Sequence, residues 1–341
     1  MSALFDNIWF QNAAVVLGFA LFFALLALAS RNERWQKAWA RLRKDRMGMI
    51  SACVVILYML IGAMESIQFH TKEQGSVSLL GLVFARVAHE KTYSAPWART
   101  TLSISAPEPL NGWHLMGTDA LGNDTFVLAL RACRTALIIG GLTSVIYIPL
   151  GTLLGLFAGY YRRWVDDLIQ YVYSTVSAIP DILLLVSMLM VLGKGLGTMS
   201  IALATTSWIG LCRLIRGETM RQAERPYVPA ARSLGQSHWN IITRHLLPNV
   251  MHLVLINFVL GFSGLVITES ILSYLAVGAP IGTPSWGAMI DGARGELSRA
   301  PVVWWNLAAA TGALFFLVLS LNIFGNALRR AFDPRANAKL Q

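Results

Sequence analysis

The composition of the chain indicates a membrane protein. Of its 341 residues, 55 % are hydrophobic and only 13 % are charged, while the formal net charge is +10. An apolar share this large is typical of a chain surrounded mostly by lipid. The positive charge does not indicate a nucleic-acid-binding protein, because the basic residues lie in short segments beside apolar stretches, where membrane proteins keep them.

Seven segments are apolar and long enough to cross the bilayer as helices, which takes about 20 residues each. They lie at 9–29, 48–66, 135–159, 168–192, 198–215, 252–277 and 302–326. The first segment lacks the basic start and the short apolar core of a secretory signal, so we interpret it as a retained transmembrane helix. The sequence therefore predicts an all-α polytopic membrane protein.

The basic residues predict which loops face the cytoplasm. The segment 31–47 carries the densest cluster, and the positive-inside rule assigns it to the cytoplasmic side. The amino terminus and the segment 67–134 then lie outside, whereas the loop 216–251 and the basic tail 327–341 lie inside. Each of the inside segments is basic, which supports the assignment.

The segment 31–47 has a second interpretation. It could form an amphipathic helix on anionic lipid, with Trp35 and Trp39 at the level of the headgroups. The two interpretations are compatible, because both place the segment at the cytoplasmic surface of the membrane.

The polar stretch 225–249 predicts a helix, a turn and a second helix. Four residues recur at the spacing of one face of an amphipathic helix: Tyr227, Ala230, Ala231 and Leu234. Gly235 is suited to end this helix, and Ser237 can cap a second one. Pro248 is expected to block the continuation of the second helix.

These residues resemble a known loop. Ala230-Ala231, Gly235 and the Leu247-Pro248-Asn249 triplet are similar to the "EAA" loop of ABC-importer permeases. Five further motifs, in order along the chain, resemble the C-type permease of the oligopeptide, dipeptide and nickel family: HLMGTDALGND (114–124), FAGYYRRWVDD (157–167), AIPDILLL (178–185), TPSWGAMI (283–290) and RRAFDPR (329–335). Five ordered matches are much more specific than one.

The resemblance implies an architecture. It predicts a type I ABC-importer permease core at 135–326, preceded by 48–66 as the first family-type transmembrane helix and by the extracytoplasmic segment 67–134. The helix within 1–30 would be an addition, giving about seven spans with the amino terminus outside and the carboxyl terminus inside. The expected location is the inner membrane of a bacterium.

The resemblance also implies partners. It predicts a homologous second permease, two ABC ATPase subunits and an extracytoplasmic solute-binding protein. The chain has no phosphate-binding loop and no hydrolase motif, so we expect that it is not an enzyme and that ATP and magnesium are bound by the partners. The residues expected to couple this chain to the ATPase are Tyr227, Pro229, Ala230, Ala231, Leu234, Gly235 and Pro248. Peptides or nickel chelates are the expected substrates.

Three positions depart from the family pattern. Pro229 stands where the loop usually opens with glutamate, Asn123 stands where arginine is usual, and Ser174 stands where an acidic residue is expected. Because proline lacks an amide hydrogen and fits the first turn of a helix, the first helix of the loop is expected to begin near Val228 or Pro229.

Two acidic residues in apolar spans are candidates for a translocation path. An ionised carboxylate facing lipid at the centre of a span costs about 2.5–3.5 kcal/mol, so Glu269 is expected to face protein or water. It could line the path, or it could be bonded by Thr268, Ser270, Ser273 or a neighbouring subunit. Asp181, which follows a helix-interrupting Pro180, poses the same question or caps the helix that restarts there.

Asp119 and Asp124 flank a glycine turn in the first of the five motifs. They could cap two successive helices, or they could form a polar outer gate that contacts the solute-binding protein. A short apolar stretch at 79–87 is expected to form a helix on the outer face. The three cysteines, Cys53, Cys133 and Cys212, show no paired or metal-binding spacing, so neither a disulfide nor a metal site is expected.

Two other classes of protein fit less well. A secondary transporter or channel working alone would be expected to show internal repeats and paired ionisable residues, and no clear repeat is found. An intramembrane hydrolase would need a catalytic pair that the spans lack. The sequence therefore favours transport with partner subunits.

Overall fold

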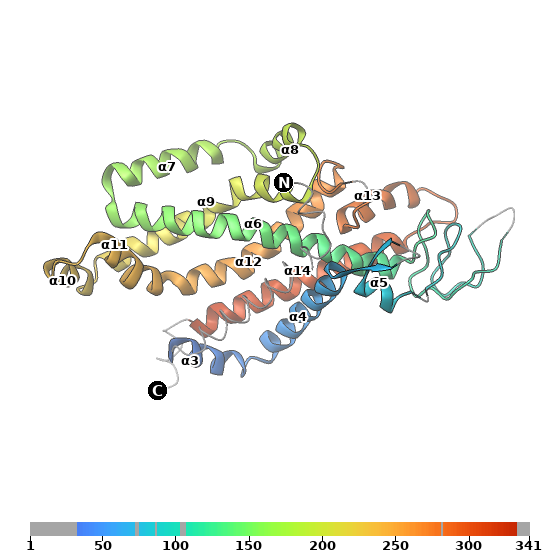
Figure 1. Ribbon diagram of the computed structural model, residues 1–341, viewed down its shortest axis with the longest axis horizontal. Helices are drawn as coiled ribbons and strands as arrows, with labels where there is room; N and C mark the ends of the chain where they lie inside the picture. Colours follow the sequence, from blue (N-terminus) through green and yellow to red (C-terminus); the bar gives the residue numbers. More distant parts are fainter. Residues whose placement is uncertain (1–32, 72–74, 86, 103–106, 281, 333–341) are drawn as a thin grey trace.

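Long helices running side by side make up most of the fold (Figure 1). The computed structural model describes residues 33–71, 75–85, 87–102, 107–280 and 282–332. Within them, five helices are long and apolar enough to cross a membrane: α4 (Arg46–Ser66), α6 (Thr125–Tyr161), α9 (Leu196–Ala223), the helical run His238–Tyr274 and α14 (Trp305–Phe332). The predicted span at 9–29 lies outside the described residues.

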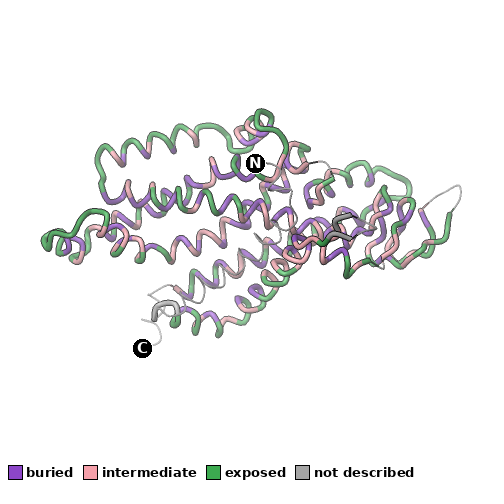
Figure 2. The backbone as a smooth tube through the Cα atoms, viewed as in Figure 1, coloured by how far each residue is buried: buried purple, intermediate pink, exposed green. Residues whose placement is uncertain are grey.

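A bent pair of helices occupies the place of the predicted span 168–192 and is apolar and long enough, taken together, to be a sixth span or a re-entrant loop. α7 (Arg163–Ser177) and α8 (Asp181–Leu192) meet at an angle of 83° at the break that Pro180 introduces into the predicted span 168–192. Both helices are largely exposed on their outward sides (Figure 2).

Shorter elements connect the spans. They are α3 (Glu33–Leu42), β1 (Gln68–Thr71), β2 (Gly75–Ser78), α5 (Leu79–Val83), α10 (Tyr227–Ser233), α11 (His238–Asn240), the π-helical turn η1 (Ile241–Leu246), α12 (Leu247–Tyr274) and α13 (Trp286–Glu296). β1 and β2 pair antiparallel, with Phe69 opposite Val77. This hairpin is a small addition to the predicted all-α fold, and α5 is the short form of the helix expected at 79–87.

α6 begins earlier than predicted. Its first residue is Thr125 rather than 135, because the Asp124 side chain accepts a hydrogen bond from the Val127 amide at 2.9 Å and caps the helix. At 1.5 Å per residue its 37 residues extend about 55 Å, well beyond the hydrocarbon core. Residues 125–134 are therefore helical and continuous with the predicted span, in a helix longer than the hydrocarbon core.

Pro248 does not block the second helix of the polar loop, contrary to the sequence-based prediction. α11, η1 and α12 follow one another without a break, and Pro248 is in the first turn of α12. The Leu247 amide bonds to the Ile242 carbonyl, five residues back, so the hydrogen-bond ladder is already shifted where proline removes its donor. A proline at that point costs the helix little.

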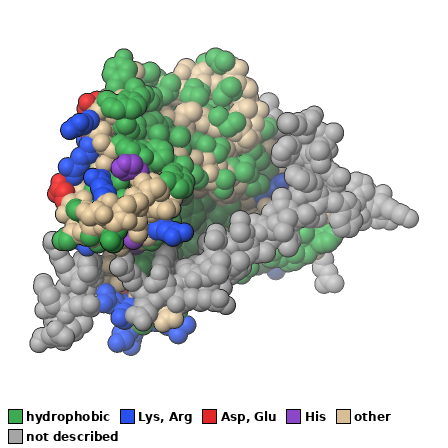
Figure 3. All heavy atoms as spheres, turned by 60° about the vertical axis from the view of Figure 1, so that its left-hand side comes forward, with side chains coloured by type: hydrophobic (Ala, Val, Ile, Leu, Met, Phe, Trp, Pro, Cys, Tyr) green, Lys and Arg blue, Asp and Glu red, His purple; other side chains and the backbone are tan. Residues whose placement is uncertain are grey.

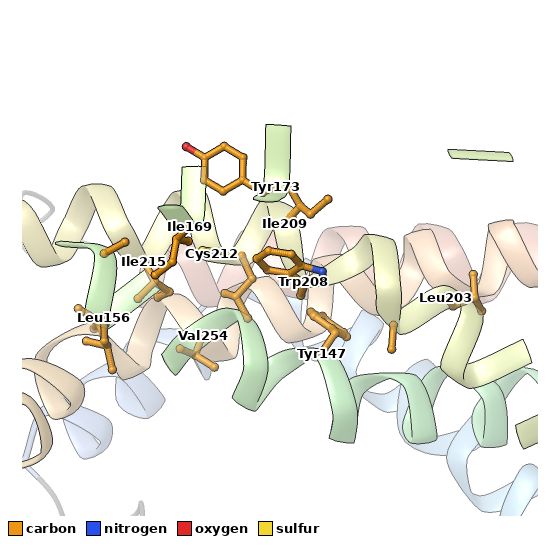
Figure 4. Packing of buried hydrophobic residues seen from close by; sticks show 14 of the residues in the cluster. Tyr147, Leu156, Ile169, Tyr173, Leu203, Trp208, Ile209, Cys212, Ile215 and Val254 are labelled. Carbon is orange, nitrogen blue, oxygen red and sulfur yellow. The ribbon is translucent and has the colours of Figure 1, made fainter. Parts of the chain in front are cut away.

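The core between α6 and α9 depends on close backbone approach. Gly151, Gly155 and Gly159 of α6 face α9, and a β-carbon at Gly155 would lie 2.8 Å from the Cys212 carbonyl oxygen. A stripe of small residues lets two helices pack more closely than lipid-facing helices otherwise do. Around this seam lie large buried side chains from four helices, including Tyr147, Leu156, Tyr173, Trp208 and Val254 (Figure 4).

A second cluster joins α3, α4, α6, α12, α13 and α14. Its centre is Trp286, which is fully buried and donates from its indole nitrogen to the Ala129 carbonyl oxygen at 2.9 Å. Tryptophan is common at membrane interfaces, but Trp286 lies inside the protein and anchors α13 to α6.

The ends of α3, α4 and α14 are held together by polar contacts. Asp45 caps α4 through the Gly48 amide and lies 2.6 Å from the Arg330 guanidinium, while Arg41 donates to the Ala331 carbonyl at 3.2 Å. The hydrogen bond from Arg330, together with that from Gly48, lowers the pKa of Asp45 below its ordinary value. The ionised Asp45 therefore stabilises the folded protein at pH values above the ordinary pKa of aspartate. This stabilisation is lost as the pH falls through the lowered pKa of Asp45 in the folded protein.

The glycine seam predicts a contrast between two substitutions in α6. Gly155→Ala should destabilise the protein by about 1–3 kcal/mol, because the added methyl group meets the α9 backbone. Gly141→Ala should be neutral or slightly stabilising, since a β-carbon there meets nothing within 4 Å. Thermal unfolding of the purified protein in detergent measures both. Equal midpoints for the two variants would show that the seam does not need glycine.

Candidate functional site

α10 forms the tip of the loop between α9 and α12, at one end of the molecule (Figure 1). It has seven residues, and its inner face consists of Val228 and Ala231, which are buried in the cluster around α6 and α9. Pro229 and Ala230 are exposed, and Leu234 is 81 % exposed. The helix therefore presents a small apolar surface outward.

The predicted face of this helix is only partly buried. Of its four residues, Ala231 is buried and Tyr227 is half-buried, but Ala230 and Leu234 are exposed. The helix begins at Tyr227 and ends at Ser233, so Leu234 lies at the cap, where the chain turns away from the bundle. A two-turn helix is too short for an apolar stripe to fix its orientation.

Gly235 ends the helix as expected. Its φ angle is +73°, a left-handed conformation that glycine adopts without strain. Its amide donates to the Arg232 carbonyl at 2.9 Å, and the Gln236 amide donates to the Ala231 carbonyl at 3.1 Å. These bonds direct the chain towards Ser237, whose hydroxyl caps α11 through the Asn240 amide at 3.3 Å.

Tyr160, at the end of α6, connects α10 to the bundle. It is 4 % exposed, and its hydroxyl lies 2.7 Å from Nδ1 of His238. The Arg232 guanidinium lies 4.8 Å from the centre of the Tyr160 ring and donates to its hydroxyl at 3.3 Å. One side chain of α6 therefore contacts both ends of the turn that follows α10. The motif 157–167 contains Tyr160, but its pattern alone does not indicate this role.

An ion pair fixes α7 to α9. Asp166 of α7 accepts two hydrogen bonds from the Arg216 guanidinium of α9, one of them at 2.7 Å. Arg213, one turn away, stacks over the Tyr173 ring at 4.7 Å and donates to the Ser177 hydroxyl at 3.1 Å. The sequence contains a signal for these contacts, namely two arginines three residues apart in an apolar span. A charged side chain in such a span needs a polar or aromatic partner.

The two path candidates lie in different surroundings. Glu269 is 1 % exposed, and it accepts hydrogen bonds from the Ser273 hydroxyl at 2.8 Å and the Ser270 hydroxyl at 3.2 Å. Thr268, another expected partner, donates instead to the Gly264 carbonyl. Asp181 is exposed in the first turn of α8. The helix dipole stabilises its negative charge there, but its side chain makes no capping hydrogen bond.

Asp119 and Asp124 organise the outer loop in different ways. Asp124 caps α6 and lies 2.8 Å from Nδ1 of His114, whose Nε2 lies 3.3 Å from the buried Glu90 carboxylate. Asp119 caps no helix, contrary to one expectation; it accepts bonds from the Leu121 and Asn123 amides within a turn. Only one helix, α6, therefore starts in this motif. The Asp119 side chain is used to hold the turn 119–123 and does not cap a second helix.

The cysteines and the acidic residues provide no further site. Cys133 and Cys212 are buried, Cys53 is exposed, and all three are free thiols. Across the described ranges, no group of three or more His, Cys, Asp and Glu side chains is arranged to hold a metal ion.

Comparisons with known proteins agree with this arrangement of apolar spans and a polar loop. The sequence profile of the binding-protein-dependent transport system inner membrane components matches residues 151–338. The profile of the N-terminal transmembrane domain of oligopeptide transport permease C matches residues 33–65. These helices thus define a multi-pass permease of the inner membrane.

The relatives are permease proteins of transport systems. A glutathione transport system permease protein of Shigella dysenteriae is 32 % identical over 305 residues, which cover 88 % of this chain and 90 % of the relative. An oligopeptide transport system permease protein of Bacillus subtilis is 28 % identical over 301 residues, with the same coverage of 88 % and 90 %. The chain belongs to the family of binding-protein-dependent transport system inner membrane components and is a permease of the ABC-importer type.

The turn after α10 should depend on the backbone freedom of Gly235. Gly235→Val should loosen α10 by roughly 1–2 kcal/mol, because a β-branched residue is strained at positive φ. Gly235→Asn is the matched control, since asparagine tolerates this conformation and a β-carbon there meets nothing within 4 Å. Hydrogen exchange of the amides in 227–236 measures the effect, and equal protection in both variants would contradict it.

Proposed function

We propose that this chain is one of two homologous permease subunits of an ATP-driven importer, and that α10 is its contact with a separate ATPase subunit. The observation that carries the proposal is the division of α10 into two faces. Val228 and Ala231 fix the helix to the bundle, while Pro229, Ala230 and Leu234 remain open to a partner. An apolar surface this small on a fixed helix suits insertion into a groove.

The proposal places α10 on the cytoplasmic side of the membrane. The loop 216–251 is basic, as the positive-inside rule expects of an inside loop. ATP and magnesium would then be bound and used by the ATPase pair, and this chain would bind no cofactor. The solute-binding protein would dock at the opposite end, where Asp119 and the exposed Leu121 lie, while the buried Asp124 would support that surface by capping α6.

Movement of the ATPase pair would reach the spans through three connections. α10 is continuous with α9 and α12 through short turns, and Tyr160 connects it to α6. The glycine seam makes α6 and α9 one rigid body, and the Asp166–Arg216 pair adds α7. A push on α10 would therefore tilt these helices together and open a central cavity alternately to each side.

This coupling predicts that Leu234 contributes to binding of the ATPase. Leu234→Asp should weaken the association roughly ten- to a hundredfold, since burial of a leucine side chain is worth about 1.5–3 kcal/mol. Transport should be lost while the chain still folds, because the side chain is 81 % exposed. Co-purification of the ATPase with the permease pair measures the association, and ATP-driven uptake of substrate into proteoliposomes, with ATP hydrolysis alongside, measures transport.

Leu121→Asp is the matched control for that experiment. Leu121 is 71 % exposed at the opposite end of the molecule, so the same substitution there should leave ATPase association unchanged. If Leu234→Asp assembles and hydrolyses ATP like the wild type, α10 is not the coupling element.

We further propose that the substrate is a short peptide. The relatives are named for the transport of glutathione, oligopeptides and dipeptides, which share the peptide bond and charged ends. Uptake of a labelled dipeptide by cells expressing the whole importer should therefore be competed by unlabelled di- and tripeptides but not by a free amino acid. Competition by a nickel chelate alone would assign the importer to metal uptake instead.

A further inference from the structure

α3 has two chemically different faces at the point where the chain enters the membrane. Ala38 and Leu42 are buried and pack in the cluster that includes Ala327 and Leu328 of α14. Trp39 points the other way and is 49 % exposed. The Arg43 guanidinium lies over the Trp39 ring, 5.4 Å from its centre. One face is therefore attached to the protein, and the other presents an aromatic ring with a cation.

The residues that follow α3 change from basic to apolar within two turns. Arg43, Lys44 and Arg46 are exposed, and then Met47 and Ile50 of α4 are exposed as well. In a transmembrane helix, such a change marks the boundary between the headgroups and the acyl chains. If α4 spans the bilayer, this change of character places the cations of the turn at headgroup level.

α3 lies at the same end of the molecule as α10 (Figure 1). Turned to bring this end forward, the surface shows several basic side chains and few acidic ones (Figure 3). Asp45 is the acidic residue within the turn, but it is occupied by the Gly48 amide and by Arg330. The remaining cations of the turn therefore present a positive surface.

We propose that α3 and the turn 43–46 form a binding site for the phosphodiester headgroups of anionic phospholipids in the cytoplasmic leaflet. The assignment to that leaflet rests on the orientation given under the proposed function. Arg43 and Lys44 supply the charge, while Trp39 supplies a ring suited to the interface. Each cation near an anionic surface strengthens binding about fivefold.

Lipid fits this surface better than a protein or a nucleic acid. Its basic residues lie directly before the first residues of an apolar span, so a soluble partner would have to reach into the headgroup layer. An aromatic ring stacked by arginine beside exposed Met47 matches the mixed polar and apolar character of the interface.

Bound lipid would also act on α14. Arg41 holds the Ala331 carbonyl, and Asp45 holds Arg330, so α3 and its turn are attached to the last turn of α14. Headgroups bound to α3 would restrain that end of the span while α10 moves.

Lipid retention tests the proposal directly. The full importer is reconstituted with phosphatidylcholine and phosphatidylglycerol, washed in detergent, and the phosphatidylglycerol retained per protein is measured by mass spectrometry. Arg43→Gln/Lys44→Gln should bind phosphatidylglycerol roughly twentyfold more weakly than the wild type, with phosphatidylcholine unchanged. Arg43→Lys should retain it, because the charge remains. Brominated phosphatidylglycerol should quench the tryptophan fluorescence of the wild type more than that of the Trp39→Phe variant.

Arg225→Gln/Arg244→Gln is the control for net charge. Both arginines are exposed in the polar loop, away from the α3 turn in sequence, so this variant should retain phosphatidylglycerol like the wild type. Equal loss in both double variants, or no loss in either, would overturn the proposal. Loss of ATPase association with unchanged lipid retention in the α3 variant would assign the surface to a protein partner. Because the lipid readout does not depend on α10, failure of the Leu234 experiment would leave it interpretable.

Discussion

The close contact between α6 and α9 is the constraint on which the rest of the structure depends. Three glycines let the α6 backbone lie against the carbonyl groups of α9, and no side chain can be added there without moving one helix. Because α9 leads into α10, and the end of α6 carries Tyr160, the two helices hold the polar loop from both sides. The position of the loop is thus set by backbone packing deep in the bundle.

Much of the fold follows from residue pattern alone. The length of the apolar stretches identified the described spans. One of them is divided at Pro180, because proline has no amide hydrogen to continue the helix. Glycine at 235 adopts the positive φ that its place in the loop indicated. The family was recognisable because six short motifs occur in order, and the sequence profiles agree with it. Such features are local, so a single sequence contains them.

The features that sequence reasoning missed are contacts between distant segments. The bond between Tyr160 and His238 joins residues far apart in the chain, and the pattern of neither motif indicates the other. Trp286 seemed suited to an interface by residue type, but tertiary packing buries it. Which residues of α10 are buried could not be predicted, because two turns give an apolar stripe too few positions to specify a face.

The π-helical turn between α11 and α12 has a consequence for how the chain can change length. A turn in which amides bond five residues back contains one residue more than an α-helix needs. Loss of a single residue from 241–246 would convert it to a regular α-helical turn and leave the faces of α12 against their present neighbours. One residue can therefore be deleted from this turn, next to Pro248, without rotating α12 about its axis.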